Sequence, residues 1–346
     1  MSTSELIFDR APLRVYWEVT RACDLACRHC RADAVRSPHP RELTNLEALH
    51  LLERLAASGD PKPHVVFTGG DPLKRPDLWV LIVAARALGL AISVAPSATE
   101  LLGAEEIRRF QESGVEAISL SLDGSTPARH DAVRGLWGTF TRTLEAARAA
   151  RATGLPFQLN TLVAAETLDD LPALYLLAND LGAARWSLFF LVSVGRGTVL
   201  EQISPAEAEN VMCWLAELAG QKGGPIVTTT EAPHFRRVML ERRRANAHGR
   251  AAGIRDGNGI MFISHTGEVQ PSGFLPLSAG NVRTADVVAI YRESPLFRTL
   301  RRADLFGGRC GRCEFHWQCG GSRARAYAAS GDPFGEDPLC TYTPRG

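Results

Sequence analysis

Short apolar runs alternate with longer amphipathic segments from residue 14 to about residue 220. The short runs are rich in β-branched and aromatic residues, which favour strands. The longer segments are rich in alanine and leucine, with apolar residues three or four positions apart, as in a helix that buries one face. The predicted strands are Arg14–Thr20, His64–Thr68, Ala91–Ala95, Ala117–Leu122, Phe157–Val163 and Arg185–Val192. The predicted helices are Asn45–Ala57, Asp77–Leu88, Ala104–Ser113, Thr139–Thr153, Asp169–Leu181 and Pro205–Leu218.

Six strand–helix units in succession predict a parallel sheet, because each crossover brings the chain back in the same direction. This is the α/β class, and six units suit a partial (β/α)6 barrel similar to a TIM barrel. The functional site of such a barrel lies at the C-terminal ends of its strands. We assign residues 1–222 to this barrel, because Gly223-Gly224-Pro225 interrupts the pattern.

The chain after residue 222 has a different character. Residues 223–258 are a predicted connecting segment, in which Arg236–Arg250 is rich in arginine and has no clear apolar period. Gly259–Gln270 predicts a hairpin with its turn at Thr266-Gly267, and Val287–Arg302 predicts a helix. The remaining loops are rich in cysteine, glycine and proline, and bound metal would supply the stability that their small apolar content cannot. We therefore expect a small metal-binding domain at residues 259–346.

Composition and charge exclude several classes of protein. The chain of 346 residues is 45% hydrophobic and 22% charged, with a net charge of +1 that gives no reason to expect a nucleic acid or a membrane surface as partner. No apolar run approaches the roughly 20 residues that span a bilayer. Residues Met1–Arg10 lack the basic and apolar pattern of a signal peptide. We expect a cytoplasmic protein.

Seven of the eight cysteines fall into two groups, which in a large chain of this kind indicate metal sites. Three thiolates at CxxxCxxC spacing can hold three irons of a [4Fe–4S] cluster and leave the fourth iron open to a chelating substrate. A zinc ion with His29 as its fourth ligand is the alternative at the first group, and a four-thiolate zinc site is the alternative at the second. The first group is Cys23, Cys27 and Cys30, and the second is Cys310, Cys313, Cys319 and Cys340.

The CxxxCxxC motif after the first strand of a six-unit barrel resembles the signature of the radical S-adenosylmethionine (radical SAM) superfamily. The resemblance implies a [4Fe–4S] cluster on Cys23, Cys27 and Cys30, whose open iron binds the amino and carboxylate groups of SAM. One electron, supplied by a flavodoxin or ferredoxin type of donor, then cleaves SAM to methionine and a 5′-deoxyadenosyl radical. That radical removes a hydrogen atom from the substrate, so the cofactor performs the difficult chemistry.

Loops after the later strands resemble those that the superfamily uses to hold SAM. Gly69-Gly70-Asp71-Pro72 stands in the place of a GGE-type motif, and Ser119–Gly124 resembles the family's SLDG. Pro96–Thr99 departs from the TNGT pattern of many members. The SAM-contacting residues that the resemblance implies are Gly69, Gly70, Asp71, Pro72, Ser97, Ser121, Asp123 and Asn160.

The C-terminal cysteines resemble the SPASM or twitch region of radical SAM enzymes, which carries auxiliary iron–sulfur clusters. Ser272 and Ser322 stand where the family has two cysteines of the first auxiliary cluster. The four cysteines that remain match the ligand set of the second, and the resemblance therefore implies two [4Fe–4S] clusters in all. Cys213 lies in a predicted apolar helix, where core packing is its expected role and hydrogen-atom donation the alternative.

Several segments resemble the haem-biosynthesis branch of this group, whose members act on carboxylate side chains of tetrapyrroles. They are Ser193–Gly197, Thr230–Arg237 and Ser322–Ala326. A guanidinium binds a carboxylate through two parallel hydrogen bonds, so the arginines of these segments are candidate substrate anchors. Arg196 is the first of them, as an anchor for the substrate or for SAM, and the others are Arg236, Arg237 and Arg323.

The expected function follows from these resemblances. The substrate is a small carboxylated metabolite of cofactor or natural-product biosynthesis, and the reaction is a decarboxylation or another redox-coupled C–H transformation. One alternative is a peptide maturase that works with a separate leader-peptide-binding partner. The other is a metal-cluster scaffold without catalytic activity.

Overall fold

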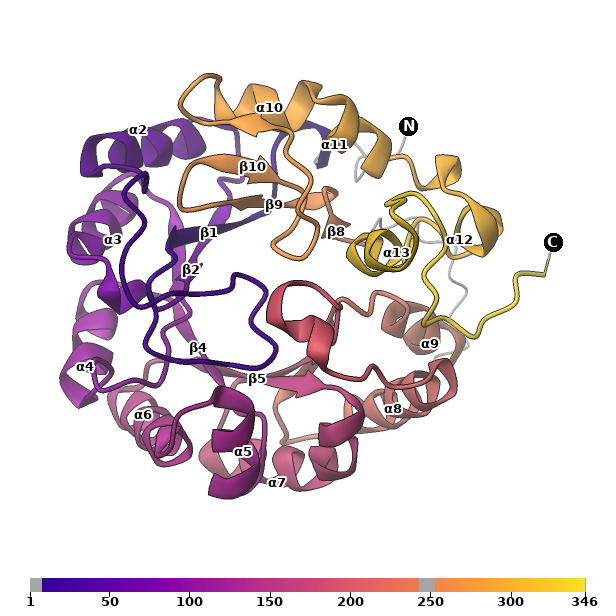
Figure 1. Cartoon of the computed structure of the whole chain (residues 1–346), viewed down its shortest axis with the longest axis horizontal. Helices are drawn as coiled ribbons and strands as arrows, with labels where there is room; N and C mark the ends of the chain where they lie inside the picture. Colours follow the sequence, from indigo (N-terminus) through magenta and orange to yellow (C-terminus); the bar gives the residue numbers. More distant parts are fainter. Residues whose placement is uncertain (1–7, 243–252, 346) are drawn as a thin grey trace.

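One curved, mainly parallel sheet organises the fold, and the computed structural model describes it over residues 8–242 and 253–345 (Figure 1). Seven parallel strands follow one another across the sheet in chain order. They are β1 (Arg14–Thr20), β2 (His64–Gly69), β3 (Ala91–Val94), β4 (Ala117–Ser121), β5 (Phe157–Val163), β6 (Arg185–Phe190) and β7 (Ile226–Thr230).

Helices cover the outer face of this sheet and bury its apolar residues. Alternate residues of each strand point outward, and among them Trp17, Phe67 and Trp186 are almost inaccessible to solvent in one continuous core with the helices. The helices are α2 (Asn45–Ala56), α3 (Leu78–Ala87), α4 (Ala104–Glu112), α5 (Pro127–Arg134), α6 (Thr139–Thr153), α7 (Leu171–Leu181), α8 (Pro205–Leu218) and α9 (Phe235–Arg242). Three short 3-10 helices, η1 (Pro72–Lys74), η2 (Ala165–Asp170) and η3 (Gly195–Val199), follow β2, β5 and β6.

The C-terminal part of the chain extends the same sheet at its β1 edge. Strand β9 pairs in parallel with β1, and the sheet ends in the antiparallel strands β10 and β11. The elements of this part are β8 (Arg255–Asp256), β9 (Gly259–Ile263), β10 (Glu268–Gln270), β11 (Gly280–Asn281), α10 (Val287–Glu293), α11 (Pro295–Leu300), η4 (Ala303–Leu305), α12 (Gly308–Arg312) and α13 (Arg323–Ser330). No pairing joins β7 to β11, so the barrel is partial and open on one side.

The predicted fold class is confirmed, with four differences. The parallel series has a seventh strand, β7, inside the predicted connecting segment, and α5 precedes the predicted helix α6. The predicted hairpin forms, but it belongs to the barrel sheet, so the sheet continues past the boundaries predicted at residues 222 and 259. The predicted helix Val287–Arg302 is two helices, because Pro295 cannot continue α10 and begins α11 instead.

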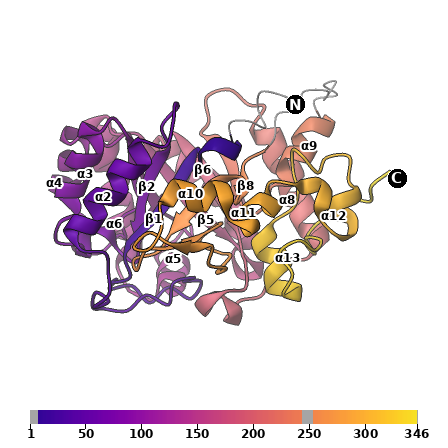
Figure 2. The same ribbon diagram turned by 90° about the horizontal axis from the view of Figure 1, so that it is seen from above.

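The last helices lie beside the open side of the barrel. Figures 1 and 2 show α12 and α13 next to β8 and α9, away from α2–α6. Helix α9 takes up the first part of the arginine-rich segment, and residues 243–250 of that segment lie outside the described residues. Throughout the described ranges, every helix is too short or too polar to cross a membrane.

Candidate active site

The first three cysteines lie in the loop that follows β1. Cys23 and Cys27 are buried, Cys30 is half-buried, and the three side chains pack together with Leu25. The loop is fixed by backbone hydrogen bonds from Cys23 N–H to the Val35 carbonyl at 2.8 Å and from Cys30 N–H to the Cys27 carbonyl at 3.2 Å. Three free thiols are thereby gathered at the C-terminal end of β1.

The surroundings of these thiols fit an iron–sulfur cluster. Burial raises the pKa of Cys23 to about 11, so the thiol keeps its proton unless a metal displaces it. The Cys23 sulfur accepts a hydrogen bond from Leu25 N–H at 3.4 Å and lies 3.6 Å from Ser97 Oγ. Arg134 Nη1 donates to the Cys27 sulfur at 3.5 Å. Hydrogen bonds to sulfur and a nearby cation are contacts that tune the potential of cluster-bound thiolates.

Gly69 and Gly70 bring the end of β2 against the cysteine loop. Gly69 has φ +154°, and a Cβ there would lie 2.3 Å from the Thr20 carbonyl oxygen. A Cβ on Gly70 would lie 2.4 Å from the Ala22 carbonyl oxygen. Only glycine allows this approach, so the predicted SAM motif is packed directly on the loop that carries the thiols.

Asp71 is fully buried, and its carboxylate organises the neighbouring loops. Its Oδ1 accepts from the N–H groups of Leu73 at 3.2 Å and Ser97 at 3.3 Å, and its Oδ2 accepts from Thr99 Oγ1 at 2.9 Å. Pro72 beside it begins η1 and is also buried. The structure therefore gives Asp71 a role in holding the loops after β2 and β3, and its contact with SAM stays a prediction.

Ser97 lies in the loop after β3 and Ser121 ends β4, whereas Asn160 lies in the middle of β5 and not at the strand end. Ser121 pairs with Asn160 in the register of β4 and β5, and Gln158 Nε2 donates to Asn160 Oδ1 at 2.6 Å. Ser97 Oγ donates to the Gly70 carbonyl at 3.0 Å. All three side chains are half-buried on the same side of the barrel as the cysteine loop. Their contacts with SAM stay predictions.

Asp123 is buried and holds Arg134, which was not among the predicted site residues. Asp123 Oδ2 pairs with Arg134 at 2.7 Å, and its Oδ1 accepts from Leu162 N–H at 2.7 Å. Burial alone would raise the pKa of Asp123, but the Arg134 charge holds that pKa below its usual value. The ionised carboxylate thus positions the guanidinium beside Cys27.

Arg196 carries the clearest anion-binding feature near the thiols. Its N–H donates to the Cys30 carbonyl at 3.0 Å, and Gly195 packs so closely that a Cβ there would lie 2.6 Å from the carbonyl oxygens of Cys30 and Arg31. Arg196 Nε and Nη2 are buried and have no hydrogen-bond partner among the described residues, nor has Nδ1 of His29. Buried guanidinium donors without a partner are costly unless an anion binds them.

The other three arginines suggested as anchors are already engaged within the protein. Arg236 donates to the carbonyls of Gln318 and Ile254, and Arg237 pairs with two glutamates. Arg323 is fully buried and donates to the carbonyls of Gly321, Pro333 and Gly335. The expectation that these three bind a substrate carboxylate is therefore not supported.

Cys213 stands apart from both cysteine groups. It lies on α8, and its half-buried side chain packs against the core between the helices and the outer face of the sheet. This position fits the packing role and gives no support to hydrogen-atom donation at the inner side of the barrel.

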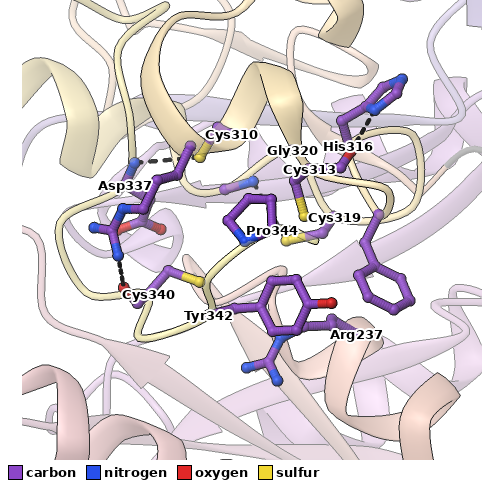
Figure 3. Close-up of a pocket in the computed structure, with 13 residues that line it drawn as sticks. Arg237, Cys310, Cys313, His316, Cys319, Gly320, Asp337, Cys340, Tyr342 and Pro344 are labelled. Atoms are coloured by element: carbon purple, nitrogen blue, oxygen red, sulfur yellow. Dashed lines mark hydrogen bonds between the residues drawn. The ribbon is translucent and has the colours of Figure 1, made fainter. Parts of the chain in front are cut away.

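The four C-terminal cysteines line one pocket, together with Arg237, Asp337 and Tyr342 (Figure 3). Asp337 N–H donates to the Cys310 sulfur and Gly321 N–H donates to the Cys319 sulfur, both at 3.4 Å. Burial raises the pKa of Cys319 to about 12 and that of Cys340 to about 11, so these thiols also need a metal to become thiolates.

The spacing of the metal-binding side chains bears on the choice between zinc and a cluster. In the part of the chain that the structure describes, no three His, Cys, Asp or Glu side chains converge closely enough to hold a single metal ion. Four thiols spread around one pocket fit the several irons of a [4Fe–4S] cluster better than a tetrahedral zinc ion.

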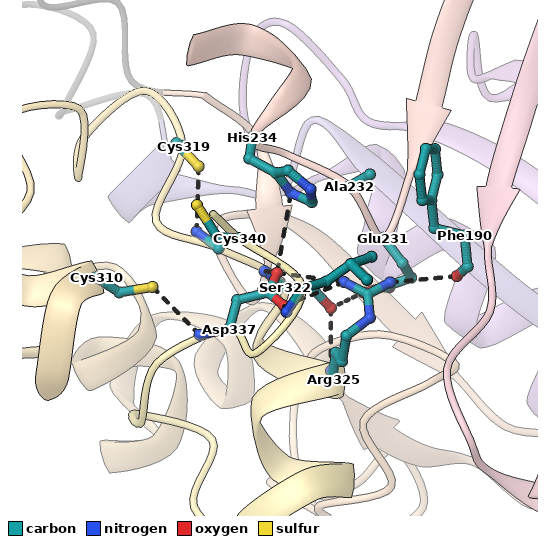
Figure 4. A network of polar contacts seen from close by, with 12 residues as sticks. Phe190, Glu231, Ala232, His234, Cys310, Cys319, Ser322, Arg325, Asp337 and Cys340 are labelled. Atoms are coloured by element: carbon teal, nitrogen blue, oxygen red, sulfur yellow. Dashed lines mark hydrogen bonds and ion pairs between the residues drawn. The ribbon is translucent and has the colours of Figure 1, made fainter. Parts of the chain in front are cut away.

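The two serines at the family's cysteine positions lie outside that pocket. Ser322 caps α13 and donates through Oγ to Glu231, while its N–H donates to Asp337 Oδ2 at 2.8 Å (Figure 4). Arg325 pairs with Asp337 at 3.2 Å in the same buried network. Ser272 Oγ accepts from the N–H of Phe274 at 3.3 Å. Hydrogen bonds within the protein thus take the place of metal contacts at both serines.

Comparison with known proteins identifies the family. The radical SAM superfamily matches this chain over residues 17–178, the span that holds the first cysteine group and the loops after β2–β5. The chain belongs to the radical SAM superfamily, whose members use a [4Fe–4S] cluster and SAM.

Within the superfamily, the chain groups with enzymes of the haem-biosynthesis branch. It is 40% identical to the AdoMet-dependent heme synthase of Nitratidesulfovibrio vulgaris, over 96% of this chain and 92% of that protein. It is 38% identical to the AdoMet-dependent heme synthase of Methanosarcina barkeri, over 96% and 97%. The Fe-coproporphyrin III synthase of the same organism is 29% identical, over 97% and 89%.

The fold comparison bears on the predicted barrel. Streptococcus suis SuiB bound to S-adenosylmethionine matches with a TM-score of 0.75 at 16% identity, over 96% of this chain and 78% of that one. At this identity the likeness supports the fold alone, and it confirms the predicted barrel. The sequence comparisons confirm the predicted superfamily and branch.

Proposed function

We propose that this protein is a radical SAM enzyme that removes carboxyl groups from side chains of an iron porphyrin in the synthesis of haem or a haem-type cofactor. The observation that carries the proposal is the pair of buried, unpartnered Arg196 nitrogens beside the cysteine loop. They stand in a chain that is 40% identical to a haem synthase over nearly its whole length.

In this proposal, Cys23, Cys27 and Cys30 hold the cluster, which supplies the electron for SAM cleavage when it is bound. Ser97 and Arg134 adjust the sulfur ligands through the contacts described above. The glycine pair after β2, with Ser97, Ser121 and Asn160 on the adjoining strands, provides the SAM surface. Together these residues bind and orient the cofactor and exclude water from it.

The proposed reaction converts a propionate side chain to a vinyl group. The substrate carbon gives one hydrogen atom to the 5′-deoxyadenosyl radical, and the side chain then loses carbon dioxide and one electron. The balance requires a one-electron acceptor. A second [4Fe–4S] cluster on the four C-terminal cysteines is the candidate, since zinc in the same pocket has no redox chemistry.

The test is an anaerobic assay with the reconstituted protein, SAM, a strong reductant and iron coproporphyrin III. We expect 5′-deoxyadenosine, carbon dioxide and a porphyrin that has lost carboxyl groups, all detected by mass spectrometry. Cys213→Ala serves as the matched control and retains these products. If 5′-deoxyadenosine forms but the porphyrin is unchanged and unbound, the substrate assignment is wrong while the radical SAM assignment stands.

A peptide substrate is the second candidate. It is favoured only by relatives of lower similarity, such as the PqqA peptide cyclase of Gluconobacter oxydans at 28% identity. The relatives at 38–40% identity are haem synthases, and the order of similarity therefore favours the porphyrin.

A further inference from the structure

The inner face of this partial barrel carries many polar residues. Ordinary (β/α)8 barrels fill their interior with bulky branched residues. Here the outward residues of β1 and β6, such as Trp17 and Trp186, belong to the core with the helices, so their neighbours in sequence point inward. The polar residues of the inward series are Arg14, Tyr16 and Glu18 on β1, Gln158 and Asn160 on β5, and Arg185 and Ser187 on β6, and the apolar Leu162 and Phe189 follow on β5 and β6.

Two of these inward residues are arginines without a carboxylate partner. Arg14 Nη1 donates to Tyr16 Oη at 3.5 Å, and within the described residues no acid forms an ion pair with Arg14 or Arg185. Both side chains keep some solvent access. Arg75 and Arg325, by contrast, both pair with aspartates.

The two guanidinium groups act on each other across the interior. Burial lowers the pKa of Arg185, and the charge of Arg14 lowers it further. Burial and the same Arg14 charge lower the pKa of His64 on β2. Glu116 lies 3.9 Å from His64, and the inward Glu18 is engaged by Arg31 and His265. The charges of Arg14 and Arg185 thus repel each other without an acid paired to either, and a bound anion would relieve this repulsion.

The position of this pair relative to the SAM-contacting residues suggests what the anion is. Arg185 pairs with Gln158 in the register of β5 and β6, and Ser187 pairs with Asn160. Arg185 thus lies two residues before the level of Asn160, a distance of about 7 Å along the strand. If the reacting carbon of the substrate lies at the strand ends, a second carboxylate of the same substrate molecule could reach the level of Arg185 inside the barrel.

We propose that Arg14 and Arg185 form an anion-binding site inside the barrel, and that its ligand is a carboxylate of the substrate other than the one that reacts. The identity of the ligand, but not the existence of the site, rests on the proposed function. The site would orient a polycarboxylate substrate so that one particular side chain faces the 5′-deoxyadenosyl radical. Two guanidinium forks suit a carboxylate or a phosphate, and the experiment distinguishes a substrate side chain from a free anion.

The first measurement is the thermal stability of the reconstituted full chain with and without citrate or inorganic phosphate. We expect the anions to raise the melting temperature of the native protein and of Arg298→Gln, a control on the exposed surface of α11. Arg14→Gln and Arg185→Gln should lose this response. Without added anions these two variants should be as stable as the native protein or more so, because a repulsion is removed. A loss of stability without anions would show a structural role and overturn the site.

The second measurement is the affinity for iron coproporphyrin III, followed by absorbance. Arg185→Gln should bind it tenfold to a hundredfold more weakly, as expected for the loss of one charge-assisted contact, and Arg185→Lys should bind it with intermediate affinity. SAM cleavage without substrate should not change. If Arg185→Gln loses the response to citrate or phosphate but binds the porphyrin as tightly as the native protein does, the ligand of the site is a free anion and not a substrate carboxylate. Failure of the native protein to bind the porphyrin would reject the proposed function, and the stability measurement would then decide the anion site alone.

Discussion

Arg134 on α5 reaches Cys27 in the loop after β1, where its Nη1 donates to the sulfur at 3.5 Å and its Nη2 pairs with Asp123 at 2.7 Å. The guanidinium is buried, so its charge acts on the sulfur through a medium of low polarity. Helix α5 is thereby linked to the proposed cluster, and Asp123 holds the guanidinium that contacts the Cys27 sulfur.

The first prediction concerns the reduction potential of the cluster. Replacing Arg134 by glutamine removes a positive charge beside a ligand sulfur, which makes the reduced, more negative cluster less favourable. We expect a midpoint potential lower by roughly 60 mV, equal to about 1.4 kcal/mol for a one-electron couple. EPR-monitored redox titration measures it. Arg134→Lys should restore most of the difference, and Arg129→Gln, on the exposed side of the same helix, should leave the potential unchanged.

The second prediction concerns metal content. Two [4Fe–4S] clusters correspond to about eight irons per chain, and changing Cys23, Cys27 and Cys30 together to alanine should leave about four and abolish release of 5′-deoxyadenosine. Elemental analysis and the SAM cleavage assay test both points. About four irons and one zinc in the native protein would show a zinc site in the C-terminal pocket. About twelve irons would contradict the interpretation of Ser272 and Ser322.

The sequence predicted the strands of the barrel and the two cysteine groups because both depend on local patterns. Strand β7 was not predicted, because it is short and Val227 is its only buried residue. Helix α5 was not predicted, because its buried face includes His130, Asp131 and Arg134 and therefore shows no periodic pattern of apolar residues. Elements whose buried side is polar are recognised only once their partners are known.

Individual arginines show a second limit of the sequence. Arg196 and Arg323 were both predicted carboxylate anchors, with Arg196 as the first choice. In the structure, the Arg323 guanidinium donates hydrogen bonds to backbone carbonyls. Two nitrogens of the Arg196 guanidinium have no hydrogen-bond partner among the described residues. Whether a guanidinium is free depends on segments far apart in the chain, so no local motif reveals it.

The third prediction concerns stability at acidic pH. His130 Nδ1 accepts a hydrogen bond from Asp123 N–H at 3.1 Å, and burial lowers the pKa of His130 from 6.5 to about 4. The unfolded chain therefore takes up this proton before the folded chain does. Stability is lost as the pH falls below about 6.5, and the loss is complete near pH 4. At pH 5 the loss from this group alone amounts to about 2 kcal/mol.

His130→Asn tests this prediction, because its amide oxygen can still accept from Asp123 while it takes up no proton. We expect the fall in melting temperature between pH 7 and pH 5 to be smaller in this variant than in the native protein. His50→Asn, on the exposed surface of α2, is the control and should keep the full pH dependence. Equal pH dependence in all three proteins would show that His130 does not contribute.

The last prediction separates the two roles that the structure allows Arg196. Its unpartnered Nε and Nη2 could bind a substrate carboxylate or the carboxylate of SAM itself. Lysine keeps the charge but loses the two-pronged geometry, so Arg196→Lys should weaken binding of whichever carboxylate is held. Loss of one charge-assisted contact should cost about 1.5–3 kcal/mol, roughly a tenfold to hundredfold change in affinity. If Arg196 holds the substrate, porphyrin affinity falls while SAM cleavage without substrate persists, which is the result we expect. If SAM cleavage without substrate is lost, Arg196 belongs to the cofactor site. If neither porphyrin affinity nor SAM cleavage changes, the role of Arg196 is to hold η3 on the cysteine loop through the hydrogen bond from its backbone N–H to the Cys30 carbonyl.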